Sequence, residues 1–167
     1  LRPGRKFDLR AFNEAERRAI QAGIEQGQAE IRAAAGRYGT TIDGWTYGDR
    51  HLGNFGDDYL YRALVALTGL AALEPAEAIY VTCTVDSDGR PLDGAGRYEL
   101  TFPAGGQPPA HAFWSLTMYE VTLEGRAFLV DNPIGRYAIG DRTTGLIRSP
   151  DGSLTLHLQH ERPDKGR

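Results

Sequence analysis

The sequence predicts a single compact domain of mainly β structure, with helices at its N-terminal end and a jelly-roll-like antiparallel β-sandwich after them. The chain has 167 residues, of which 41% are hydrophobic and 25% charged, as in an ordinary globular domain. Before Pro75 the apolar residues recur at helical spacing, whereas after Pro75 they alternate along short segments separated by turns. We therefore expect a helical segment and connector over 1–56, and a helix followed by the sandwich over 57–167.

A capping box predicts where the first helix begins. Asn13 stands three residues before Glu16, the spacing at which each side chain caps the other residue's backbone amide. Gly23 and Gly27 each cost about 1 kcal/mol inside a helix. We expect a helix over 13–35 that depends on packing through its apolar residues, which are Ala19, Ile20, Ile24 and Ile31.

A glycine-rich and aromatic connector over 36–56 follows, for which we expect no regular structure. The next segment, 57–73, has leucines at helical spacing and is followed by Pro75, which cannot continue a helix. We expect a second helix there with one apolar stripe, made of Leu60, Leu64, Leu67 and Leu70 with Ala71.

The remainder of the chain contains several short strand patterns. They cover 79–85, 97–102, 111–119, 127–130 and 154–158. In the third segment we expect Trp114, Leu116 and Met118 to face the core, and we expect the wholly apolar 127–130 to lie inside the sheet. Turn residues at 86–89 and 149–152 separate the strands.

Composition excludes some classes of function. The net charge is −3 and the isoelectric point is about 5.8, without a basic stripe, so nothing indicates a nucleic-acid partner. No apolar stretch is long enough to span a membrane, and we expect a soluble protein of unknown compartment. The chain begins at Leu1 rather than Met, as a fragment or processed product does, and it shows no signal peptide. Cys83 is the one cysteine, which excludes an intrachain disulfide, and we expect it to be buried.

Metal and cofactor motifs are missing from the sequence. There is no glycine-rich phosphate motif and no nucleophile elbow. His157 and His160 are three apart on a predicted strand and should point to opposite faces, and His51 and His111 are far apart in sequence. The segment 86–94 lacks the bidentate Glu of a calcium loop and is better interpreted as a turn. We expect no metal and no cofactor.

Two segments carry residues suited to a polar, ring-bearing ligand. The connector places aromatic side chains beside Asp49, Arg50 and a histidine, and the segment 131–143 combines arginine, aspartate, asparagine and tyrosine. The candidate ligand-binding residues are Trp45, Tyr47, His51, Tyr119, Asn132, Arg136, Tyr137, Asp141, Arg142 and His160. The structural alternative is that Arg136 and Arg142 pair with Asp131 and Asp141, while Trp45 and Phe55 pack the connector against the sandwich.

An ordered series of motifs resembles a bacterial family, the "domain of unknown function 1214". The matching segments are Ala112-Phe113-Trp114-Ser115-Leu116-Thr117-Met118-Tyr119, 129–133, 136–143, 151–154 and Gln159-His160, with 86–94 fitting the opening strand and turn. The resemblance covers about residues 57–165 and implies a jelly-roll-like sandwich that often follows a second domain, numbered 1254. It implies no activity, cofactor or catalytic residue. The family usually continues with a Trp-Leu-Pro stretch and one more strand, so we expect either a longer chain or a partner that covers an open sheet edge.

Three hypotheses of function follow. The first is a module that binds a small polar ring-bearing molecule or a glycan. The second is an enzyme, a hydrolase or lyase, with His51 or His160 as a base beside Tyr119 or Tyr137. The third is a structural or oligomerisation module, either a homo-oligomer or one that meets a partner domain, in which the apolar segment 127–130 is covered by another subunit.

Overall fold

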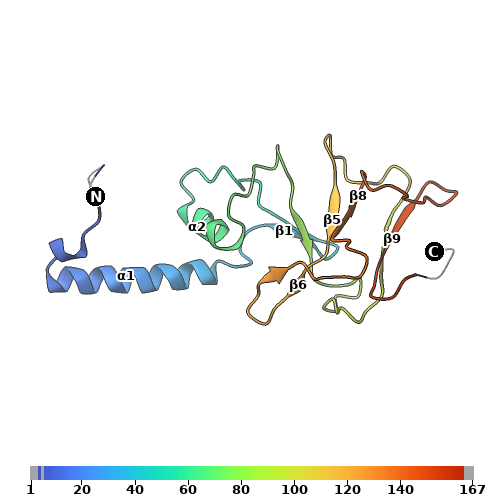
Figure 1. Ribbon diagram of the computed structural model, residues 1–167. Coiled ribbons are helices and arrows are strands. Elements are labelled where there is room, and N and C mark those ends of the chain that lie inside the picture. Colours follow the sequence, from blue (N-terminus) through green and yellow to red (C-terminus); the bar gives the residue numbers. More distant parts are fainter. Residues whose placement is uncertain (1–3, 5, 164–167) are drawn as a thin grey trace. The chain divides into compact units, whose positions relative to one another are not determined.

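The computed structural model describes residue 4 and residues 6–163 of the chain. Helices account for 21% of the residues and strands for 19%, so the chain is mixed rather than mainly β, which corrects the sequence-based expectation. The described residues contain two α-helices and nine short strands, all paired antiparallel in small sheets (Figure 1). The chain divides into two compact units, Leu1–Arg90 and Pro91–Arg167, and each is described here by itself.

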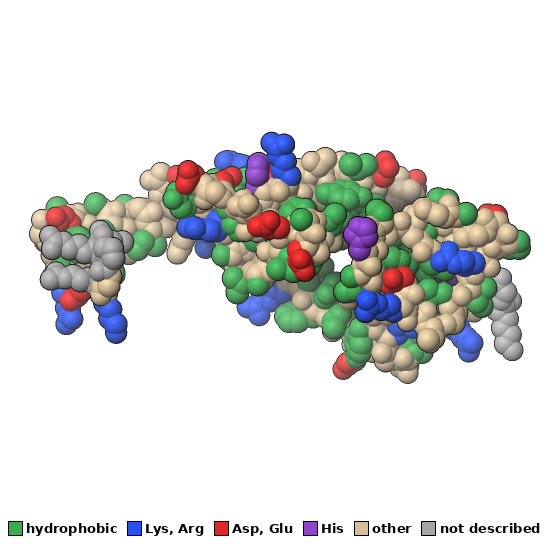
Figure 2. Space-filling model, turned by 90° about the horizontal axis from the view of Figure 1, so that it is seen from above, with side chains coloured by type: hydrophobic (Ala, Val, Ile, Leu, Met, Phe, Trp, Pro, Cys, Tyr) green, Lys and Arg blue, Asp and Glu red, His purple; other side chains and the backbone are tan. Residues whose placement is uncertain are grey.

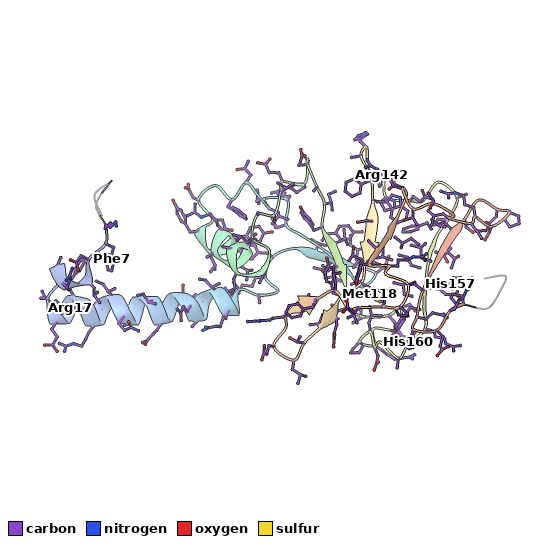
Figure 3. All side chains as sticks on the ribbon, in the orientation of Figure 1. Phe7, Arg17, Met118, Arg142, His157 and His160 are labelled. Atoms are coloured by element: carbon purple, nitrogen blue, oxygen red, sulfur yellow. The ribbon has the colours of Figure 1, made fainter. Side chains whose placement is uncertain are left out.

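The first helix begins where the capping box predicts. A short 3-10 turn, η1 (Leu9–Ala11), precedes α1 (Glu14–Ala33). The backbone N–H of Glu16 donates to the Asn13 side chain at 2.9 Å, and that of Asn13 donates to the Glu16 carboxylate at 2.8 Å. Arg17 donates to the carbonyl oxygen of Phe12 at 2.7 Å, which ties the preceding turn to the start of the helix (Figure 3).

The second helix is shorter than expected. α2 (Tyr59–Thr68) begins at Asp58, whose carboxylate accepts from the backbone N–H of Tyr61 at 2.9 Å. It ends at Gly69, well before Pro75, because glycine is a weak helix former that leaves the helical conformation easily. The expected leucine stripe is therefore only partly right: Leu64 is buried, but Leu67 is exposed.

A small aromatic and aliphatic core holds the first unit together. The Tyr61 ring stacks on Tyr38, with centroids 4.1 Å apart, and meets the edge of Phe55 at 5.3 Å. Phe55 therefore packs the connector against the core around α2, and not against the sandwich as the structural alternative predicted. The buried residues of this core are Ala34, Leu52, Tyr61, Leu64 and Val65.

The connector is not without structure, contrary to expectation. β1 (Thr40–Ile42) and β2 (Trp45–Tyr47) form a hairpin, and β2 also pairs with β3 (Val81–Cys83). The turn between β1 and β2 is Asp43–Gly44, and both residues have positive φ, 49° and 80°. Asp-Gly between β-branched and aromatic residues is a strong hairpin signal, because such two-residue turns require positive φ at both positions.

The second unit consists of three two-stranded sheets. β4 (Tyr98–Phe102) pairs with β9 (Leu154–Leu158), β5 (Ser115–Thr117) with β8 (Ala138–Gly140), and β6 (Glu120–Val121) with β7 (Ala127–Phe128). β4 and β9 match the predicted segments closely, whereas β5 and β7 are shorter than the segments 111–119 and 127–130. The jelly-roll closure of these sheets stays a prediction.

Burial in the second unit follows the prediction only in part. Leu154 and Leu156 are buried, and Trp114 and Leu116 are half-buried, with the Trp114 ring 5.2 Å from that of Phe102. Met118 is exposed, so its assignment to the core was wrong (Figure 3). The segment 127–130 is exposed as well, because the β6–β7 sheet has two strands and no other strand of the described chain extends it.

The two predicted turns are confirmed. The Asp86 carboxylate accepts from the backbone N–H groups of Asp88 and Arg90, each at 2.9 Å. In the second turn, Gly152 donates to the carbonyl of Ser149 at 2.8 Å. Cys83, next to the first turn, is only half-buried, and its thiol contacts the carbonyl of Val85 at 3.1 Å.

Over the part of the chain that is described, no helix combines the length and the apolar character needed to cross a membrane.

Candidate functional site

A turn at the end of β2 presents polar side chains on the surface of the first unit. The Asp49 carboxylate accepts from the backbone N–H of His51 at 2.9 Å, and the backbone N–H of Leu52 donates to the Asp49 carbonyl at 2.9 Å. Leu52, the last residue of the turn, is buried in the core of this unit and so fixes that end of the turn. Arg50 and His51, which lie between Asp49 and Leu52, are exposed.

A shallow hollow of about 380 Å³ lies beside this turn. We call it the Tyr47 hollow. Tyr47 and Tyr80 give it two aromatic walls, and both rings are partly exposed. They come together because Tyr47 pairs with Val81 in the β2–β3 register, which places the residue before Val81 at the same end of the sheet. The residues that line the Tyr47 hollow are Thr40, Tyr47, Gly48, Asp49, Arg50, Leu52, Pro75, Ala78, Ile79 and Tyr80.

His51 forms a hydrogen-bonded pair with Asp49, which lines the Tyr47 hollow. His51 Nδ1 lies 3.0 Å from Asp49 Oδ1. When Nδ1 carries the proton toward the carboxylate, Nε2 is left as the free acceptor of the ring. This is the arrangement in which a carboxylate orients a histidine for proton transfer.

The core beneath the turn is electrostatically coupled to it. Burial raises the pKa of Tyr61, while a backbone hydrogen bond from Asp49 acts in the opposite direction and the charge of Asp49 adds to the increase. Burial also raises the pKa of Tyr38, and so does the hydrogen bond between its hydroxyl and Asp58, 3.1 Å long. Both phenols therefore favour the neutral form.

The segment 131–143 of the second unit is held by its own polar side chains. The Asn132 side-chain amide donates to the carbonyls of Val130 and Arg136 at 3.3 and 3.1 Å, and its oxygen accepts from the Arg136 backbone at 2.9 Å. The Tyr137 hydroxyl donates to Asp131 at 3.0 Å. The side chains of Asn132 and Tyr137 thus stabilise the loop by hydrogen bonds within it. Arg136 takes part in these hydrogen bonds only through its backbone.

Asp141 and Arg142 also serve the fold of the second unit. The Asp141 carboxylate accepts from the backbone N–H of Trp114 at 3.2 Å. Arg142 donates to the carbonyl of Ala112 at 2.9 Å, and its guanidinium lies 5.1 Å from the centroid of the Phe113 ring (Figure 3). Both residues line a second shallow hollow, of about 220 Å³. The ion pairs of Arg136 and Arg142 with Asp131 and Asp141 do not form among the described residues. Asp131 accepts from the Tyr137 hydroxyl, whereas Asp141 and Arg142 bond to backbone groups.

Trp45, Tyr119 and His160, the other predicted site residues, line neither hollow. Trp45 is half-buried on β2 opposite Cys83, and Tyr119 is exposed between β5 and β6. His157, on β9, lies 3.3 Å from Glu99, whereas His160 follows the strand and is exposed (Figure 3). Residues 4 and 6–163 contain no group of three or more His, Cys, Asp or Glu side chains that could hold a metal ion.

Sequence reasoning missed Tyr80 as a site residue. The signal was present, because alternation in 79–85 assigns Ile79, Val81 and Cys83 to one face and so leaves Tyr80 on the other. Its nearness to Tyr47 depends on the pairing of β2 with β3, two strands separated by the whole of α2. Of the candidate residues named from the sequence, Tyr47 lines the hollow directly. His51 is next to it, because it is hydrogen-bonded to the lining residue Asp49.

Comparison with known proteins gives one result. Residues 77–167, more than half of the chain, match a family model described as "Protein of unknown function (DUF1214)". No curated protein and no solved structure shows significant similarity to the chain. The relation to a preceding domain numbered 1254 stays a prediction.

Proposed function

The chain belongs to the DUF1214 family of proteins of unknown function, and from this premise we propose that it binds a small polar, ring-bearing ligand in the Tyr47 hollow. A sugar or a sugar acid is the ligand class that suits the lining best. The observation that carries the proposal is that Tyr47 and Tyr80 line one hollow together with Asp49 and Arg50.

The hollow offers both parts of a sugar site. An exposed tyrosine ring supplies a flat apolar surface for a ring-bearing molecule and a hydroxyl that can hydrogen-bond to it. Small-molecule sites combine such apolar walls with a few polar groups, and their volumes are roughly 300–1,000 Å³. The Tyr47 hollow, at about 380 Å³, lies at the lower end of this range, which favours a ligand of one or two rings.

Arg50 adds a preference for an acidic ligand. Among the described residues its side chain makes none of the hydrogen bonds or ion pairs found in the structure, whereas the neighbouring Asp49 already accepts from His51. A guanidinium that is free on the wall of a hollow can take a carboxylate in a bidentate pair. A sugar acid would therefore bind more tightly than the corresponding neutral sugar.

We expect Tyr47→Ala to weaken binding of galacturonic acid about tenfold, because the stacking surface on one wall is lost. The measurement is a titration of the full chain followed by NMR chemical shifts, with galacturonic acid and galactose as the probes. Arg50→Gln should weaken galacturonic acid binding by a similar factor and leave galactose binding unchanged.

Tyr59→Ala is the matched control for the stacking wall. Tyr59 is an exposed tyrosine of the same unit that contacts Arg62 and does not line the hollow. It should leave both affinities unchanged. Absence of binding by both sugars, or equal losses in Tyr47→Ala and Tyr59→Ala, would reject the site.

An enzyme is the second candidate, and the His51–Asp49 pair favours it. The 3.0 Å contact places an oriented imidazole next to a residue that lines the hollow, as a general base requires. The pairing of a histidine with Tyr119 or Tyr137 stays a prediction; the Tyr137 hydroxyl donates to Asp131. Turnover of oligogalacturonate in the same samples, lost in His51→Ala while galacturonic acid still binds, would distinguish an enzyme from a binding module.

A further inference from the structure

We propose that the β6–β7 hairpin of the second unit, with its flanking residues, is the surface through which two copies of this chain associate. The surface comprises residues 118–130 and is called the 118–130 hairpin below. Seven large apolar side chains of this short segment are about half exposed or more. They are Met118 (62%), Tyr119 (52%), Val121 (62%), Leu123 (109%), Phe128 (50%), Leu129 (49%) and Val130 (47%).

Large apolar side chains lie on both faces of the hairpin, with Glu120 on the face of Phe128. The register pairs Glu120 with Phe128 and Val121 with Ala127. Because side chains alternate along a strand, Tyr119 and Val121 share one face, while Phe128 and Val130 share the other. Large apolar side chains on both faces of a hairpin are typical of a layer buried between two others. Here both faces are open to solvent over the described residues.

The hairpin is nevertheless well formed. Thr122 and Arg126 close it through a backbone hydrogen bond of 2.8 Å, and the backbone N–H of Arg126 also donates to the Thr122 hydroxyl at 3.2 Å. The turn fixes the register, so the exposed apolar side chains keep a fixed pattern. An isolated two-stranded hairpin is marginally stable in water, so this one requires a further contact.

The exposed area matches a dimer interface. A large apolar side chain that is half exposed presents roughly 100 Å², so the seven residues offer about 700 Å² of apolar surface. A standard protein–protein interface buries about 800 Å² on each partner, and its core is apolar. With polar rim atoms added, the 118–130 hairpin has the area that one half of such an interface needs.

Charge and backbone favour a second copy as the partner. Residues 91–167 carry nine Asp and Glu against eight Lys and Arg, a net charge of −1, so like copies do not repel each other strongly. β6 and β7 each have one neighbouring strand among the described residues, which leaves an edge available to antiparallel pairing. Two identical apolar edges related by a twofold axis are self-complementary, as an isologous dimer requires.

The test is the mass of the full chain in solution by light scattering, over a range of protein concentrations. We expect a dimer, with twice the 18.3 kDa of one chain. Val121→Lys and Phe128→Lys place a charge on opposite faces of the hairpin, and each should give a monomer. A wild-type chain that is monomeric at every concentration, or a dimer that survives both substitutions, would overturn the proposal.

Ile147→Lys is the matched control. Ile147 is an apolar residue of the same unit that is more exposed, at 85%, and lies outside the hairpin. This variant should remain a dimer. Amide hydrogen exchange of the wild-type chain gives a reading that is independent of variant folding: protection of 118–130 should rise with protein concentration, while that of 144–149 should not. Equal behaviour of the two segments would also overturn the proposal.

Discussion

At the scale of single residues, one tyrosine links the core of the first unit to its surface. Tyr61 is almost fully buried, stacks on Tyr38 and meets Phe55, and it is coupled to Asp49 of the surface turn. Because burial raises its pKa above the ordinary value of 10.0, the folded state prefers the neutral phenol. Ionisation of this phenol therefore opposes folding.

We expect the free energy of unfolding to fall as the pH rises above 10, and Tyr61→Phe to reduce that fall. The contribution of a group with a raised pKa is fully present below its unfolded pKa and is lost as the pH rises through the folded pKa. Urea unfolding at pH 8, 10 and 11 measures this. Tyr59→Phe, which changes an exposed tyrosine, should keep the wild-type pH dependence. Part of the fall should persist in Tyr61→Phe, because the pKa of Tyr38 is also raised. Identical curves for the two variants would contradict the assignment.

At the scale of elements, the residues near a helix start or a turn are enough to predict it from the sequence. Such local patterns fail where the structure of an element depends on the elements packed against it. Asn13 and Glu16 set the start of α1, and Asp86 forms its own turn, both through atoms only a few residues apart. The Asp43–Gly44 hairpin also has a local sequence signal, the Asp-Gly pair itself. The many glycines of the connector favoured an irregular segment instead, and that expectation was wrong.

Glycine substitutions test how freely these elements are packed. A Cβ at Gly23 or Gly27 of α1 would meet no atom within 4 Å, so Gly23→Ala and Gly27→Ala should each stabilise the helix by about 1 kcal/mol.

Gly53 has a φ of +81°, and its Cβ would lie 2.7 Å from the backbone nitrogen of Glu74. Gly53→Ala should therefore destabilise the chain by about 1–2 kcal/mol, from the left-handed conformation alone. Urea unfolding and far-ultraviolet circular dichroism measure both effects. A loss of stability in Gly27→Ala would show that a partner packs on that face of α1.

At the scale of the whole molecule, the distribution of apolar surface sets the two units apart. The first unit has a continuous core of five buried residues, whereas the buried hydrophobic residues described for the second unit are Leu154 and Leu156. Many of its other large apolar side chains are exposed. Figure 2 shows hydrophobic side chains, in green, on the face of the molecule that it draws. The proposed dimer gives this surface a partner.

Leu154→Ala should destabilise the second unit by about 3 kcal/mol, since truncation of a fully buried leucine removes its burial energy and leaves a cavity. Urea unfolding followed by the signal of Trp114, which lies in the same unit, is the measurement. Ile147→Ala removes a comparable side chain from an exposed position and should change stability by less than about 0.5 kcal/mol. A small effect of Leu154→Ala would mean that β4 and β9 do not form the core of this unit.

The sequence by itself determined the features whose atoms lie within a few residues of one another. These are the start of α1, the turns at 86–89 and 149–152, and the alternation that buries Leu154 and Leu156 on β9. The pattern of family motifs over 77–167 belongs with them.

Only the tertiary structure decided which strands pair and which side chains meet. Leu156 faces Leu100 across 56 positions of sequence, and Tyr47 meets Tyr80 through the pairing of β2 with β3. Periodicity gives the faces of a strand but not the element that covers each face. It therefore assigned Met118 and 127–130 to a core, whereas both are exposed in the part of the chain that the structure describes. The physical reason is that burial depends on the partner that covers a face, and that partner is not encoded in the local pattern.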